Sequence, residues 1–159
     1  MDKVDVANEY IKYRENVLKY TNIDMNLELE NEQQVYIAVF DIPTDSIVQN
    51  NHTKTLALVF GLNTHIYWGN GEVLVGLEKN KEIMQSMQSL FISSSQVLKS
   101  MRLTEDWSYY DSDKVRAYLK TKKGVYFKEL SNESREERFL AMLMQNVLSA
   151  ISKNLSKIS

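Results

Sequence analysis

Residues 105–113, with the sequence EDWSYYDSD, carry the side chains of this chain that are best suited to binding chemistry. Three aromatic residues stand among four acids: Glu105, Asp106, Trp107, Tyr109, Tyr110, Asp111 and Asp113. Tryptophan and tyrosine offer large, rigid contact area and are enriched in binding hot spots. Acids around them steer a positively charged partner toward the surface. The segment therefore predicts a site that binds a protein partner, with a basic partner favoured by charge.

Tyr67 and Trp68 form a second candidate contact site, at the expected tip of a hairpin. For both sites the alternative is that aromatic rings such as Trp107 fill the edge of the core, leaving a solvated rim. The Gly69-Asn70-Gly71 sequence predicts a type I′ turn, because Asn-Gly suits the two positive φ angles of that turn. It leads into a strand-like segment, whereas phosphate-binding loops lead into a helix N-terminus. We therefore expect a turn without a phosphate site.

Residue types with other chemistries are scarce or dispersed. The chain has no cysteine, which excludes disulfides, thiolate zinc ligands and cysteine nucleophiles. His52 and His65 show no local acid–histidine–acid grouping, and a metal site needs three or more convergent ligands. No pair among the 21 acids stands out as general acid and base. We expect no catalytic residue, metal or cofactor, and the alternative is a small enzyme or ligand-binding protein whose pocket the sequence hides.

Composition and charge narrow the classes of partner. The 159 residues are 43% hydrophobic and 25% charged, values typical of a single globular domain spanning residues 1–159. The net charge is −2 and the lysines and arginines are scattered, whereas nucleic-acid binding usually leaves a basic face. The N-terminal residues lack the apolar region of a signal peptide, and no apolar run approaches the roughly 20 residues of a membrane span. We expect a cytoplasmic protein that binds neither nucleic acid nor membrane.

Residues 55–77 give the clearest prediction of the secondary structure that must position these residues. Apolar side chains there occupy both alternation phases of the first segment, with Leu56 and Leu58 on one phase and Ala57 and Val59 on the other. Successive side chains of a strand point to opposite faces, so such a strand must be covered on both faces. The segment predicts a central strand of an antiparallel sheet.

The same periodicities predict the remaining elements. They are a helix at 3–20, strands at 25–29 and 34–42, three strands within 54–77, a helix at 81–102, a loop at 103–113, hairpin strands at 114–120 and 124–130, and a helix from Ser134 to about 157. Pro43, the one proline, falls at a strand end. The predicted fold class is α+β, an antiparallel sheet of about five strands plus a C-terminal hairpin, packed by three helices in the order α-βββββ-α-ββ-α.

The last predicted helix has a start signal and a long apolar stripe. Ser134 and Glu137 have the spacing of a capping box. The stripe consists of Leu140, Met144, Val147, Ile151, Leu155 and Ile158. Two interpretations stay open, packing of this stripe on the protein's own sheet or a homodimer formed through the helix.

Three functional hypotheses follow. The first is a non-catalytic protein-binding module, in concrete form an immunity-type inhibitor that neutralises a basic toxin or enzyme by occlusion, with the aromatic residues of 105–113 as anchors. The second comes from topology, since the helix–sheet–helix–hairpin–helix order, the size and the acidity resemble the small acidic chaperones of type III secretion. That resemblance implies a homodimer that binds a segment of an effector, although a first sheet of about five strands exceeds the family's pattern. The third is the small enzyme or ligand-binding protein.

Overall fold

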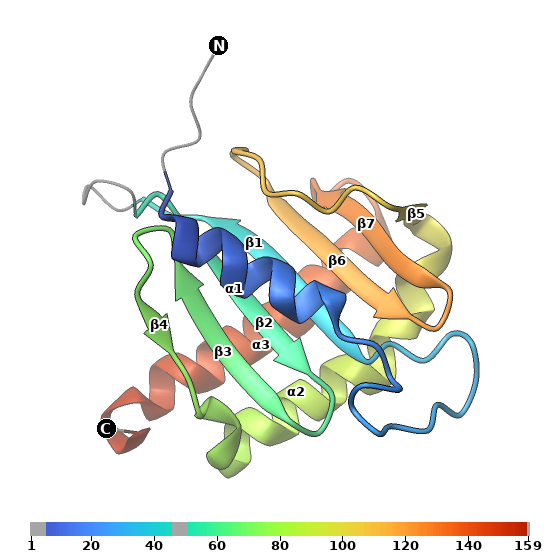
Figure 1. The fold of residues 1–159 in the computed structure, drawn as a ribbon, viewed down its shortest axis with the longest axis horizontal. Coiled ribbons are helices and arrows are strands. Elements are labelled where there is room, and N and C mark those ends of the chain that lie inside the picture. Colours follow the sequence, from blue (N-terminus) through green and yellow to red (C-terminus); the bar gives the residue numbers. More distant parts are fainter. Residues whose placement is uncertain (1–5, 46–50, 159) are drawn as a thin grey trace.

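The doubly apolar strands predicted from the sequence lie at the centre of one antiparallel sheet (Figure 1). The computed structural model describes residues 6–45 and 51–158. Across the sheet of these residues, seven strands lie in the order β4 (Val73–Leu74), β3 (Asn63–Trp68), β2 (Thr53–Val59), β1 (Ile37–Pro43), β6 (Val115–Thr121), β7 (Gly124–Leu130) and β5 (Arg102–Thr104). The predicted C-terminal hairpin, β6 and β7, is therefore part of the main sheet, because β6 pairs with β1.

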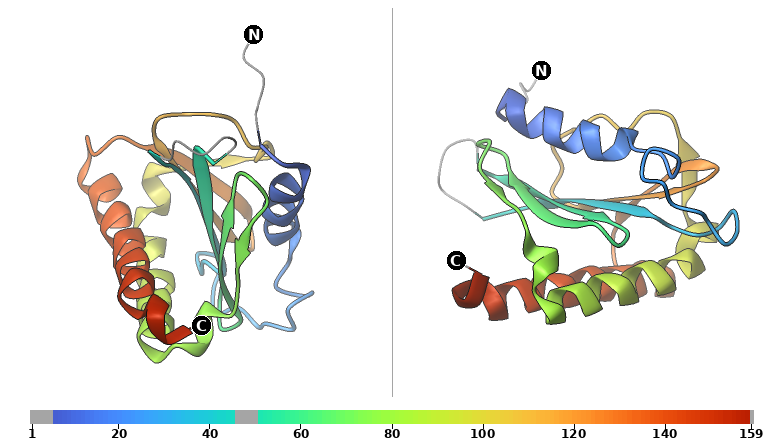
Figure 2. Two further views of the ribbon diagram at one scale, coloured as in Figure 1. Left: turned by 90° about the vertical axis from the view of Figure 1, so that its left-hand side faces the viewer. Right: turned by 60° about the horizontal axis from the view of Figure 1, so that its bottom comes forward.

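Helices cover both faces of the sheet, as the doubly apolar strands require (Figure 2). Helix α1 (Asn8–Lys19) covers one face, and α2 (Lys81–Ser94), the 3-10 helix η2 (Ser95–Ser100) and α3 (Arg135–Ile158) cover the other. A short 3-10 helix, η1 (Leu77–Lys79), precedes α2. Phe40 and Leu58 are buried on the α2–α3 face, whereas Val39 and Ala57 are buried on the α1 face. The predicted class, α+β with an antiparallel sheet and three helices, is confirmed.

The predicted strand count is wrong in two places, since β5 was not predicted and residues 25–29 form no strand. This segment is irregular, because Asn26 adopts a left-handed φ of +53° and Leu27 N donates to the Asn22 carbonyl oxygen at 2.8 Å. Met25, Leu27 and Leu29 alternate in sequence because they pack onto the outside of the α1-side core. The first block thus has four strands, and β4 has only two residues. Helix α1 begins at Asn8, and residues 3–5 of the predicted helix lie outside the described part.

Two further local predictions differ from the structure. The second helix ends at Ser94 instead of residue 102 and continues as η2, at a run of serines (93–95) whose helix propensity is below that of alanine or leucine. Strand β5 then replaces the beginning of the predicted 103–113 loop. The turn after β3 is a three-residue hairpin loop instead of a type I′ turn. Gly71 N donates to the Trp68 carbonyl oxygen at 2.9 Å, and of residues 69–71, all described, Gly71 alone has a positive φ.

The apolar stripe of α3 packs mainly against its own sheet and α2. Leu140, Met144, Val147 and Ile151 are all buried in the core on that face. Leu155 is about half exposed at 46%, and the side chain of Ile158 lies outside the described residues. The first interpretation of the stripe accounts for most of it, while a homodimer stays a prediction.

The predicted capping box at the start of α3 is confirmed. Glu137 N donates to Ser134 Oγ at 3.1 Å, and Ser134 N donates to Glu137 Oε2 at 3.2 Å. The second carboxylate oxygen, Oε1, accepts from both the backbone N and the hydroxyl of Ser131 at 2.7 Å. Burial raises the pKa of Glu137, but the hydrogen bonds from Ser131 and Ser134 outweigh burial and lower the pKa to about 2.

Replacing Glu137 with glutamine is expected to lower the free energy of unfolding at pH 6 by about 1–2 kcal/mol, because the accepting charge is lost. The folded-state pKa of about 2 lies below the ordinary 4.5, so the stabilisation is complete above pH 4.5 and is lost as the pH falls toward 2. Urea unfolding at several pH values should show the two proteins converging in acid. Glu136→Gln is the control, with a smaller effect, and a pH-independent difference at Glu137 would contradict this account.

Candidate functional site

A row of polar side chains crosses the sheet on the α1 face. Five adjacent strands contribute one residue each, directly opposite one another in register: Tyr67, Thr55, Asp41, Arg116 and Glu129. In β1, Asp41 interrupts the apolar phase of Ile37 and Val39, and it meets the other members of the row only after the strands pair. Helix α1 covers the middle of the row from one side and the 105–113 segment covers it from the other, as shown by the contacts below.

Arg14 and Asp41 form a fully buried ion pair between α1 and the central strand. Arg14 Nε lies 3.0 and 2.9 Å from the two carboxylate oxygens, and Nη2 lies 2.8 Å from Oδ2. Thr55 donates its hydroxyl to Asp41 Oδ1 at 2.7 Å, and Tyr10 OH lies 2.5 Å from the same threonine oxygen. Burial lowers the pKa of Arg14, but the adjacent Asp41 carboxylate outweighs it and raises the pKa. Arg14 therefore keeps its charge inside the protein, where a buried ion pair needs its partner to offset desolvation.

The 105–113 segment is attached to this buried network through its backbone and its tyrosines. Arg14 Nη1 donates to the Trp107 carbonyl oxygen. The Tyr109 ring packs edge-on against Tyr10 with 5.4 Å between ring centroids, and its hydroxyl donates to Asp111 Oδ1 at 2.6 Å. His52 Nε2 lies 2.9 Å from the same carboxylate oxygen. The contacts with Arg14 and Tyr10 hold Trp107 and Tyr109 in place, and the contact with His52 holds Asp111.

Arg116 supports the other end of the segment. Its guanidinium is fully buried, lies over the rings of Tyr109 and Tyr110 at 5.6 and 5.4 Å, and donates from Nη1 to the Ser112 carbonyl oxygen at 3.0 Å. Tyr110 OH donates to Glu129 Oε2. Among the described residues, Arg116 Nε and Nη2 have no hydrogen-bond partner. Stacking on two rings compensates part of the cost of burying this charge.

The predicted contact residues of 105–113 fall into an exposed and a buried group. Glu105, Asp106 and Asp113 are exposed, and hydrogen bonds from Ser108 lower the pKa of Asp106. Trp107 is half-buried, Tyr110 is 36% exposed, and Asp111 is exposed but hydrogen-bonded to Tyr109 and His52. Tyr109 is 8% exposed and belongs to the core, as in the interpretation that one tyrosine fills its edge. The structure thus brings four acids and two aromatic rings to the surface of one segment, and one of these acids, Asp111, is already hydrogen-bonded within the protein.

Tyr67 and Trp68 do not share a surface. Tyr67 is buried beneath α1, where its ring lies 5.2 Å from the ring of Tyr13. Trp68 points to the other face of the sheet and packs against the α2–α3 core. Because successive strand residues alternate between faces, the two side chains lie on opposite faces of the sheet, and neither belongs to the exposed surface of residues 105–113.

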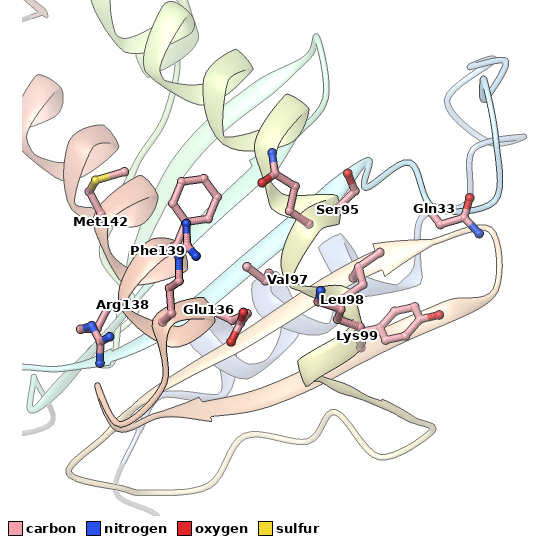
Figure 3. A pocket seen from close by; sticks show the side chains of 12 residues that line it. Gln33, Ser95, Val97, Leu98, Lys99, Glu136, Arg138, Phe139 and Met142 are labelled. Carbon is pink, nitrogen blue, oxygen red and sulfur yellow. The ribbon is translucent and has the colours of Figure 1, made fainter.

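A groove that the sequence reasoning missed lies between η2 and the first turns of α3 (Figure 3). Its volume is about 910 Å³. Val97 and Leu98 from η2, Phe139 and Met142 from α3, and Tyr126 from β7 contribute its apolar lining. The two helices are far apart in the chain, so the groove depends on how they pack and leaves no local sequence signal.

Other site classes receive no support from the described residues. In that part of the chain no three histidine, cysteine, aspartate or glutamate side chains gather as metal ligands. Nor does any helix there combine the length and apolar content needed to cross a membrane. The fold and site define a two-sided helix–sheet sandwich that displays a rigid acidic–aromatic segment. No family model matches the sequence, and neither the curated proteins nor the solved structures contain a significant match.

Proposed function

We propose that this chain is a non-catalytic protein-binding module that contacts its partner through the acidic–aromatic surface, defined as the exposed Glu105, Asp106, Tyr110 and Asp113 together with the half-buried Trp107. The observation that carries the proposal is the attachment of this segment to a buried ion pair and a buried arginine. A segment held in place before binding loses little conformational freedom when a partner docks, so more of the contact energy becomes affinity.

In its concrete form the proposed module is an immunity-type inhibitor that neutralises a basic toxin or enzyme by covering it. Trp107 and Tyr110 supply the aromatic contact area, and the exposed acids draw a basic partner into register. Tyr109 contributes indirectly, because its ring and hydroxyl fix the segment from below. Occlusion needs no catalytic group, in keeping with the absence of a catalytic motif in the sequence.

Reversing the three exposed acids, with Glu105→Lys, Asp106→Lys and Asp113→Lys together, is expected to slow partner association about tenfold or more at low salt. The fold should persist, because all three side chains are exposed. The partner is first captured on the wild-type protein from the native organism and identified by mass spectrometry. Association rates of that purified partner are then measured by surface plasmon resonance over a salt series.

The matched control is Glu28→Lys, Glu30→Lys and Glu32→Lys, which changes the net charge equally at another exposed segment. At about 0.1 M salt this control should leave the association rate within about twofold of wild type, because charge interactions are screened beyond about 10 Å at that ionic strength. Equal slowing by both triple variants would mean that net charge, and not the acidic–aromatic surface, governs binding. Unchanged rates for both would remove the segment from the interface.

A second candidate is a secretion-chaperone-like homodimer that binds an effector segment. The element order favours it: α1, then three long strands and the two-residue β4, then α2, the β6–β7 hairpin and α3. The first block has four strands in place of the predicted five, so it is closer to the pattern of those chaperones than the sequence suggested. Light scattering of the purified protein separates the candidates, since a strict monomer argues against the homodimer.

A further inference from the structure

The groove between η2 and α3 combines an apolar floor with a positively charged rim. Val97 and Leu98 are buried at its base, while Met142 is 48% exposed along its α3 side. In Figure 3, Phe139 and Met142 project from α3, and Val97 and Leu98 come from η2 on the other side of the groove. The part of this apolar lining that water reaches is therefore mainly on the α3 side, at Met142. A concave site with an apolar lining favours an occupant with an apolar body.

Three cations line this groove, Lys99 from η2 and Arg135 and Arg138 from α3. In the part of the chain that the structure describes, none of the three forms an ion pair, although the sequence has more acids than bases. Glu136 is the one acid among the lining residues. Arg138 donates from Nη1 to the Asn132 carbonyl oxygen at 3.1 Å, which leaves its other guanidinium nitrogens for a ligand. The rim therefore has an excess of positive charge that can bind an anionic group.

We propose that this groove binds a small amphiphile with an alkyl chain and one anionic head group, such as a fatty-acid carboxylate. The volume of about 910 Å³ falls in the range of roughly 300–1,000 Å³ that small-molecule sites occupy. The chain would cover Phe139, Met142 and the η2 side chains, and the head group would lie between Lys99 and the arginines. Arginine pairs with a carboxylate through two parallel hydrogen bonds, which fixes the head group in orientation.

A peptide is a poorer fit to the same groove. Extended peptides bind by adding a strand to an open sheet edge. Tyr126, the β7 residue in the lining, is already paired on both sides, with Leu119 of β6 and Leu103 of β5. At this position the sheet offers a peptide no unpaired backbone, which favours a ligand that needs only apolar contact and a counter-charge.

Isothermal titration calorimetry with monomeric dodecanoate tests the proposal on the full chain. Dodecyltrimethylammonium, which has the same chain and the opposite charge, should bind at least about tenfold more weakly. The double variant Lys99→Glu, Arg138→Glu should weaken dodecanoate binding by about tenfold or more. Met142→Asp, at an exposed position, should weaken it by introducing charge into the apolar lining. Circular dichroism melts verify that each variant is folded.

The matched control is Lys12→Glu, Lys79→Glu, an equal charge change at two exposed residues outside the groove, which should leave dodecanoate affinity unchanged. A dissociation constant weaker than about 1 mM, equal binding of both amphiphiles, or equal loss in both double variants would overturn the proposal. Binding to anionic phosphatidylglycerol vesicles without competition from dodecanoate would also overturn it, in favour of a membrane surface. The groove variants leave the acidic–aromatic surface intact, so this test fails or succeeds independently of the proposed protein partner.

Discussion

Replacing Arg14 with methionine is expected to lower the free energy of unfolding by about 3–5 kcal/mol, because it leaves the buried Asp41 carboxylate without a counter-charge. Thr55 would then be the remaining side-chain donor to that carboxylate among the contacts described above. One hydroxyl cannot replace the hydration that Asp41 has in the unfolded chain. Urea unfolding followed by circular dichroism and tryptophan fluorescence gives the free energy by linear extrapolation.

Two further variants isolate the buried charge as the cause. Lys153→Met breaks the exposed ion pair with Glu82 and should cost no more than about 1 kcal/mol. Adding Asp41→Leu to Arg14→Met should recover much of the lost stability, since removing both charges of a buried pair is often close to neutral. A loss below about 1 kcal/mol for Arg14→Met, or no recovery in the double variant, would show that packing of the arginine stem matters more than its charge.

The second large effect is expected on the opposite face of the same strand. Phe40→Ala should lower the free energy of unfolding by about 3–5 kcal/mol, because the fully buried ring leaves a cavity between β1 and the α2–α3 layer. Leu103→Ala, on the edge strand β5 where the side chain is 50% exposed, is the control and should cost about 1 kcal/mol or less. Similar losses in both variants would mean that the core is not concentrated around β1.

Local sequence could predict those parts of the fold in which the pattern of neighbouring residues alone determines the structure. Leu58 and Ala57 indicate a strand buried on both faces because adjacent apolar side chains in a strand must point to opposite sides. The capping box of Ser134 and Glu137 was predictable because it depends only on a spacing of three residues. The position of the hairpin after Trp68 was predicted correctly, but its turn type was not. A type I′ turn needs a positive φ at both Asn70 and Gly71, and of these two only Gly71 has one.

The candidate site was predictable only in part. The acidic–aromatic composition of 105–113 pointed to the segment, but its support from Arg14 and Arg116 depends on pairing between strands distant in sequence. In a single strand, Asp41 is one acid at the end of an apolar run, with nothing to indicate that a helix arginine meets it. The groove was hidden for the same reason, because Val97 and Phe139 meet only in the tertiary structure.

The pairing of β1 with β6 has a consequence for how the chain folds during synthesis. Strand β1 gains β2 as a neighbour soon after it is made, but its other edge stays open until residues 115–121 leave the ribosome. Until then the most apolar strand of the protein presents unpaired backbone, which is the template that unwanted strand pairing uses. Long-range pairing of this kind slows folding, and because α1 and α2 cover the faces of the sheet, the edge of β1 stays unpaired until β6 pairs with it.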